Sequence, residues 1–182
     1  MLATSVDRIY SDIDQLLSIL SICGEISLRS SADDTYRKSL LLSIASYFES
    51  TLSRSVLEFV EEQTSEKNIV VSLVKAKAIS RQYHTWFNWE GNNANSFFAL
   101  FGAEFKESAT KVVKEDSQLD VSIKSFLELG RDRNRLVHQD YASFPMEKTS
   151  NEIYQSYKSA LRFIEWVPIA LRKYAVHSEA QD

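Results

Sequence analysis

The stretch GRDRNRLVHQDY, residues 130–141, combines cationic side chains with a histidine in a pattern that suits work on phosphates. Its cationic residues are Arg131, Arg133 and Arg135, and its histidine is His138. A histidine exchanges a proton near neutral pH, and a guanidinium group binds a phosphate through two parallel hydrogen bonds. Asn134 can orient an imidazole or donate to a phosphate oxygen. These are the parts of metal-free RNA cleavage, in which a base deprotonates a ribose 2'-OH and arginine stabilises the charge that grows at phosphorus.

The spacing does not place all of these side chains on one face of a straight helix. Arg131, Asn134 and His138 stand at positions i, i+3 and i+7 and share a face. Arg135 lies beside them, whereas Arg133 falls about 140° from His138 at roughly 100° per residue. Two alternatives follow: the helix unwinds near its end, or Arg133 faces a different partner from the histidine.

One histidine cannot comfortably serve as the base on one side of the phosphorus and the acid on the other. A symmetric dimer that brings two copies of the helix together supplies both groups, so dimerisation is a requirement of this mechanism. The competing interpretation is a solvated, charged helix end, because runs of charge usually face water. In that case the arginines pair with Glu128, Asp132 and Asp140, and His138 only interacts favourably with the negative end of the helix dipole.

The elements that must position these residues read as helices. Four glycines and two prolines leave few turn signals, and the alternating pattern of strands is missing. The length suits one compact domain over residues 1–182, large enough to bury roughly 70% of its unfolded surface. The sequence therefore predicts a single all-α domain.

Apolar residues at helical spacing locate the individual helices. They predict helices over 2–22 and 33–63, a shorter one in 68–80, one from about Ala94 continuing through AEFKESATKVVKEDS, one over LDVSIKSFLELGRDRNRLVHQDY, and a last one from about Thr149. In the helix that carries the arginines we expect buried Val121, Phe126, Leu127, Leu136 and Val137. We expect Pro168 to kink or restart the last helix, because proline removes a backbone donor.

Composition narrows the remaining classes of function. The single cysteine, Cys23, cannot form an internal bridge, and no Cys or His pattern has metal-ligand spacing, so we expect neither a metal nor a cofactor. The apolar runs are far shorter than the roughly 20 residues of a membrane span, and the acidic N-terminal region does not resemble a secretory leader. We expect a soluble cytoplasmic protein. Its net charge of −4 argues against a protein that coats nucleic acid by charge alone, but it is compatible with a local basic site.

Three further groups of residues admit a functional and a structural interpretation. The aromatic cluster at 83–101 could stack on bases, but such clusters more often form a core or a dimer interface. Neither His84 nor His177 has a neighbouring pattern of acids or arginines, and we expect both to be structural or exposed. Lys75 with Lys77, and Lys111 with Lys114, suit solvated faces; either pair could extend a phosphate track if folding brought it near the arginines.

The segment RNRLVH, Arg133–His138, resembles the Arg-Asn-x-x-x-His form of the R-x(4–6)-H motif of the HEPN superfamily. Chance gives an Arg-Asn pair with His at this spacing roughly 0.006 times in a chain of this composition. SYFES at 46–50, the block at 83–102 and the segment at 131–167 are similar to the RiboL-PSP-type branch of that superfamily. The resemblance thus extends from about residue 40 to 167. It favours an active site over the competing interpretation of a solvated, charged helix end.

The resemblance implies a helical bundle whose motif helices meet across a dimer cleft. Many HEPN proteins are metal-independent ribonucleases in toxin–antitoxin, phage-defence or RNA-processing systems. Carried over by position, Arg133 and His138 form the catalytic pair, Asn134 supports them, and Arg131 and Arg135 bind substrate. Arg131 also fits the looser motif, so which arginine is catalytic stays open.

The implied partners are RNA, a second copy of the chain and an antitoxin protein. Some HEPN toxins carry a tyrosine two residues after the motif histidine, which a partner enzyme modifies. Here Tyr141 stands three residues after His138, so regulation of that kind does not follow from the sequence. The alternative function is a catalytically inactive HEPN module that binds nucleotide, RNA or another protein, because a fold alone does not determine an activity.

Overall fold

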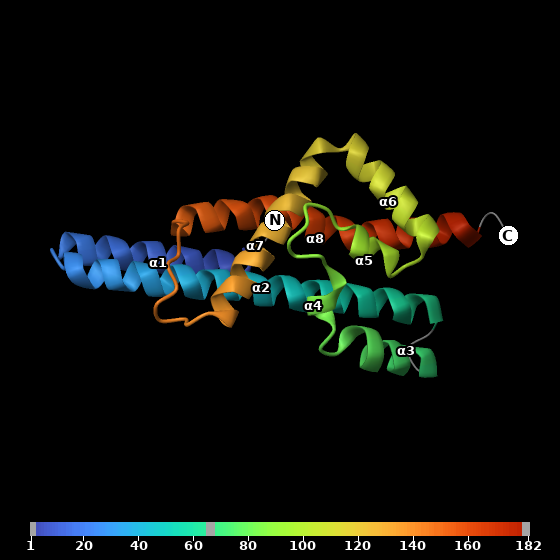
Figure 1. Ribbon diagram of the computed structural model, residues 1–182, viewed down its shortest axis with the longest axis horizontal. Helices are drawn as coiled ribbons and strands as arrows, with labels where there is room; N and C mark the ends of the chain where they lie inside the picture. The colour runs from blue at the N-terminus through green and yellow to red at the C-terminus, as the bar shows by residue number, and fades with distance from the viewer. Residues whose placement is uncertain (1–2, 65–67, 180–182) are drawn as a thin grey trace. The chain divides into compact units, whose positions relative to one another are not determined.

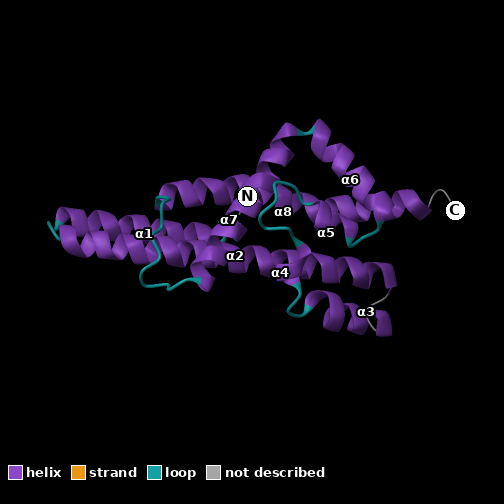
Figure 2. Cartoon of the chain, in the orientation of Figure 1, coloured by secondary structure: helices purple, strands orange, loops and turns teal. Residues whose placement is uncertain are grey.

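The computed structural model describes residues 3–64 and 68–179, with side chains as far as residue 176 (Figure 1). All regular elements in these ranges are helices and none is a strand, which confirms the all-α prediction (Figure 2). They are α1 (Ser5–Ile22), α2 (Ile26–Thr64), α3 (Ile69–Val74) with a π-helical turn (Lys75–Ile79), α4 (Tyr83–Trp86), α5 (Asn95–Ala99), α6 (Ala103–Glu115), α7 (Ser117–His138) and α8 (Ser150–Glu179).

Contacts between Cα atoms divide the chain into two compact units. One, which we call the motif unit, comprises the chain up to Tyr47 together with Leu129–Lys158. The other, the aromatic unit, comprises Phe48–Glu128 and the chain from Ser159 onward. Helices α2, α7 and α8 each contribute residues to both units. A single domain over residues 1–182 therefore stays a prediction.

Helix α1 begins and ends at the signals that its sequence supplies. The Thr4 hydroxyl accepts from the Asp7 backbone, and the Asp7 carboxylate accepts from the Thr4 backbone, which is a capping box. At the other end Gly24 adopts φ +76°, a left-handed conformation that favours glycine, and its backbone donates to the Ser21 carbonyl. The predicted helix over 2–22 is confirmed for its described part; residues 1 and 2 lie outside the described residues.

Helix α2 begins at Ile26, seven residues before the predicted start at residue 33. The turn at Gly24 sets that start, because the chain is already helical immediately after it. Within the motif unit α2 buries Leu40, Leu41 and Ile44 at helical spacing.

Helix α7 buries a narrower stripe than we expected. Phe126, Leu127 and Leu136 are buried as predicted. Val121 and Val137 are 54% and 43% exposed, so their predicted burial is wrong. The helical wheel gives the reason: Val137 is rotated about 100° from the buried Leu136, and Val121 lies similarly far off the stripe.

The segment at 83–102 contains α4 as well as the predicted loop and short helix. Its side chains Trp86, Phe87, Phe97 and Phe98 are nearly inaccessible to solvent, as expected for a core. Phe87, for example, lies 4.8 Å from Phe126 and 4.9 Å from Phe97 between ring centroids. The interpretation of these rings as core rather than as a base-stacking surface is confirmed for these four.

Helix α8 starts one residue after Thr149 and buries Ile153, Tyr157, Leu161 and Ile164 as its spacing predicts. It continues through Pro168 without ending, so a restart of the helix is wrong, whereas the alternative, a kink at Pro168, stays a prediction. The neighbouring Val167 and Leu171 are buried, and this packing compensates for the donor that proline lacks.

Candidate active site

The arginines and the histidine occupy the last two turns of α7, within the motif unit. The helix is regular as far as His138, its last residue, so unwinding at its end is excluded. Arg133 therefore faces about 140° away from His138, and its Nη1 donates to the Asn134 Oδ1 at 3.1 Å. Asn134 lies on the His138 side of the helix. It thus links the two faces on which the motif residues stand.

Burial differs among these side chains. Leu129 and Leu136 are fully buried and fix one face of the helix in the motif unit. Arg131, Arg133 and Asn134 are half-buried, whereas Arg135 and His138 are exposed. The structure thus presents His138 to solvent at the end of an anchored helix, where it is accessible to a substrate.

Two of the acidic neighbours expected in a merely charged helix end have other partners. Asp132 Oδ2 accepts from the Lys148 Nζ at 2.7 Å. The Asp140 carboxylate accepts from the Ser143 hydroxyl at 2.8 Å and from the Ala142 backbone at 3.2 Å. The Ser143 hydrogen bond is the main reason why the pKa of Asp140 is lowered. The cations of the motif are therefore not neutralised by these two carboxylates.

Arg135 is held by an aromatic contact. Its guanidinium carbon lies 5.7 Å from the ring centroid of Phe144, which is itself buried. A cation over an aromatic face is attracted by the ring quadrupole. Arg135 is thus exposed and yet restrained in direction.

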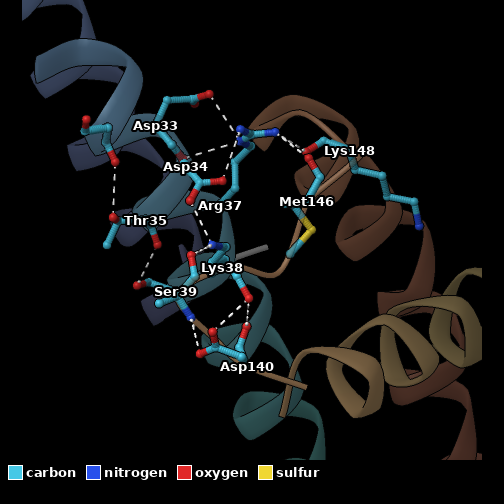
Figure 3. Close-up of polar contacts among 12 residues, drawn as sticks. Asp33, Asp34, Thr35, Arg37, Lys38, Ser39, Asp140, Met146 and Lys148 are labelled. Atoms are coloured by element: carbon cyan, nitrogen blue, oxygen red, sulfur yellow. Dashed lines mark hydrogen bonds and ion pairs between the residues drawn. The ribbon is translucent and has the colours of Figure 1, made fainter. Parts of the chain in front are cut away.

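The loop after His138 is fastened to α2 by a nearly buried lysine (Figure 3). Lys38 Nζ pairs with Asp34 Oδ2 at 2.8 Å and donates to the Ala142 carbonyl at 3.4 Å. It also lies 5.5 Å from the ring centroid of Tyr141. A lysine that is only 2% exposed must have its charge paired and hydrogen-bonded, and these contacts provide that.

A second cation of α2 fastens the same loop nearer to α8. Arg37 Nη1 donates to the carbonyls of Met146 at 2.7 Å and Lys148 at 3.3 Å, while its Nε pairs with Asp33 at 3.2 Å (Figure 3). The sequence reasoning missed both residues. The i, i+4 pairs in DDTYRK were a signal that could have found them.

The family model for RiboL-PSP-HEPN matches residues 7–171. The chain belongs to the RiboL-PSP-HEPN family. The match includes the whole of α7 and the segment of α2 that fastens the loop. Neither the curated proteins nor the solved structures gave a match.

Membership of this family supports a role in RNA cleavage or RNA binding. HEPN domains are commonly ribonucleases, and they often bind RNA and dimerise. In this HEPN chain, His84 is exposed as expected, and the side chain of His177 lies outside the described residues. Tyr141 is 41% exposed and faces Lys38.

The described residues contain no group of three or more His, Cys, Asp or Glu side chains arranged to hold a metal ion. Within the same ranges no helix is both long enough and apolar enough to cross a bilayer.

Proposed function

We propose that this HEPN protein is a metal-independent endoribonuclease that acts as a homodimer. The observation that carries the proposal is the exposed His138 at the end of a regular helix, on the same face as Arg131 and Asn134. A solvent-facing histidine beside guanidinium groups has the chemistry to move a proton next to a bound phosphate.

The proposed reaction needs only groups that the chain carries. One His138 takes the proton of a ribose 2'-OH, and the 2'-oxygen attacks the adjacent phosphorus. The bond from phosphorus to the 5'-oxygen then breaks, and the His138 of the second protomer gives that oxygen a proton. The products are a 2',3'-cyclic phosphate and a 5'-hydroxyl, so no water or metal-bound group takes part in this step.

The two faces of α7 suggest different tasks for the arginines. Arg133, which the motif favours as the catalytic arginine, is oriented by Asn134 but faces away from the His138 of its own helix. It would therefore stabilise charge on the phosphorane only at a site shared with the second protomer. Arg131, on the His138 face, and Arg135, held over Phe144, would bind neighbouring phosphates. Asn134 positions Arg133 through this hydrogen bond. It also stands four residues before His138, on the same face of the helix, where it would orient the imidazole.

Cleavage of single-stranded RNA by the purified protein in excess chelator tests the proposal. We expect His138→Ala to lower the rate about 100- to 10,000-fold, the usual contribution of a general acid–base group. His84→Ala is the matched control, because His84 is also an exposed histidine and lies in the aromatic unit. Equal cleavage by wild type and His138→Ala would show that the assigned site is wrong.

Mixed dimers test the requirement for two histidines. If both are needed, an equimolar exchange of wild-type and His138→Ala protomers leaves about one quarter of the wild-type activity, because only one dimer in four is intact. If each site uses one histidine, about one half remains. The second result would contradict the two-histidine mechanism while leaving the nuclease activity in place.

The second candidate function is an RNA-binding HEPN module without nuclease activity. The separation of Arg133 from His138 around the regular helix favours it, since binding alone does not require both side chains at one phosphate. A dimer that binds RNA and leaves it intact would decide for this module.

We place the activity in a toxin–antitoxin or phage-defence system in the cytoplasm. Expression of the wild-type chain alone should then arrest growth, and expression of His138→Ala should not. Normal growth with active wild-type enzyme would contradict the toxin role and leave the chemistry unaffected.

A further inference from the structure

A shallow hollow of about 560 Å³ lies on α6 in the aromatic unit. Its lining residues all precede the motif residues of α7 in the sequence. The polar residues that line it are Asn95, Lys106, Glu107, Thr110, Lys111 and Lys114. Three ammonium groups thus surround one concave surface, in a chain whose net charge is −4.

The amphipathic pattern of α6 puts the lysines there. Phe105 and Ala109 are buried on one side of the helix, and Lys106, Lys111 and Lys114 are exposed on the other. Position 110 stands four residues after Lys106 and four before Lys114, so this row follows one face of the helix.

The lysines of the hollow differ from several others in the chain. Lys38, Lys124, Lys148 and Lys158 each form an ion pair with an aspartate. In the described part of the chain, none of the three hollow lysines has an acidic group within ion-pair distance. Glu107 is the one carboxylate among the lining side chains named above.

The neutral groups of the hollow add a donor. The Thr110 hydroxyl donates to the Asn95 Oδ1 at 3.2 Å, which leaves the amide nitrogen of Asn95 as a further hydrogen-bond donor among the lining groups. Ammonium and amide groups both donate, and phosphate oxygens accept. A lysine contacts phosphate as a point charge, and such a contact does not depend on the base sequence of the nucleic acid.

We infer that this surface of α6 binds the sugar–phosphate backbone of single-stranded RNA. The identity of the ligand as RNA rests on the proposed function. The inference that the surface contacts a row of phosphates rests on the three lysines. The side chains seen to line the hollow include no aromatic ring, so base stacking contributes nothing and binding is independent of sequence. Glu107 opposes the ligand and limits its affinity.

Binding of 2'-O-methyl RNA tests the inference, because this probe lacks the attacking hydroxyl and stays whole whatever the fate of the nuclease proposal. Lys111→Gln with Lys114→Gln is compared with Lys75→Gln with Lys77→Gln, a matched pair of exposed lysines on the π-helical turn. A triple variant adds Lys106→Gln. Thermal unfolding followed by circular dichroism checks that each variant is folded.

We expect the triple variant to bind at least roughly tenfold more weakly at 0.15 M salt. The slope of log affinity against log salt should fall by about 2, or about 0.7 for each lost phosphate contact on a single strand. Glu107→Gln should tighten binding, whereas the pair at 75 and 77 should bind as wild type.

Unchanged affinity and salt slope in the triple variant would overturn the inference, as would competition by polyglutamate as strong as that by RNA. Displacement of the RNA by millimolar inorganic phosphate alone would show an anion site instead of a backbone track and would also overturn it. If the wild-type protein binds RNA through these lysines but does not cleave it, the proposed nuclease function is wrong and this inference still holds.

Discussion

The motif unit and the aromatic unit hold their helices together by different physical means. In the motif unit, charged and hydroxyl groups join α1 and α2 to α8 and to the loop after α7. In the aromatic unit, the rings of Phe87 and Phe163 contact each other, and each also contacts Phe97 and Phe126, with centroids at most 6.5 Å apart. Hydrogen bonds fix direction, whereas apolar packing is nearly non-directional.

The network around Asp7 shows how the polar unit works. Burial opposes the ionisation of Asp7, but hydrogen bonds from Thr4, Tyr154 and Lys158 outweigh it and lower its pKa to about 2. Burial, aided by the hydrogen bond to Asp7, raises the pKa of Tyr154 to about 12. Tyr10 stacks on Tyr154 at 3.9 Å between centroids, which joins α1 to α8 a second time.

The difference indicates where each unit is vulnerable. The motif unit, which carries the candidate site, adds to its buried leucines contacts that depend on protonation and on single hydrogen bonds. The aromatic unit depends on filled volume. Each of the following changes should therefore affect one unit through its own mechanism.

The largest effect should come from emptying the aromatic core. Phe126 is 1% exposed, so Phe126→Ala should lower the free energy of unfolding by about 3–5 kcal/mol, independently of pH. Urea denaturation measures it. Val121→Ala on the same helix is the control and should cost less than about 0.5 kcal/mol, since Val121 is exposed.

The next effect should come from the buried lysine of the motif unit. Lys38→Met removes the donor to the Ala142 carbonyl and the partner of Asp34, at a cost of about 1.5–3 kcal/mol. Hydrogen exchange should rise in residues 139–149 before the aromatic unit changes. If the ribonuclease proposal holds, kcat falls more than KM rises, and Lys38→Arg recovers part of it; uniform exchange across the chain would contradict a local role.

A pH-dependent effect should be specific to the motif unit. Because the pKa of Asp7 is depressed from 3.8 to about 2, its contribution of about 2 kcal/mol is complete above about pH 4 and is lost as the pH falls through 2. Asp7→Asn should flatten stability in this window. Acid titration of both proteins, followed by circular dichroism, measures the difference, and identical curves would refute the assignment.

The smallest effect should come from the contact between Arg135 and Phe144. Arg135→Gln should cost about 0.5–1 kcal/mol, the value of an exposed cation–π pair. Arg135→Lys keeps the charge and should retain part of the contact. Loss of RNA affinity in both variants at unchanged stability would show that the guanidinium binds substrate and has little structural weight.

Local signals in the sequence determined the helices and the family. The predicted helices are present because capping residues and apolar periodicity act within a few residues. Two predicted bounds are wrong: α2 starts seven residues earlier, and the helix predicted from Ala94 onward is interrupted between α5 and α6, where Gly102 adopts φ +102°. The motif could also be recognised in advance, since Arg133, Asn134 and His138 are close in sequence. Its catalytic role is still a prediction.

Only the tertiary structure decided which side of each helix faces a neighbour and what the loops contact. It exposed Val121 and Val137 and buried Lys38 against a loop more than 100 residues away. These outcomes depend on pairs of residues distant in sequence, and the energy of such a pair exists only after the chain has folded. The sequence alone thus specified the chemistry that the chain carries, while packing decided which of those groups solvent and substrate can reach.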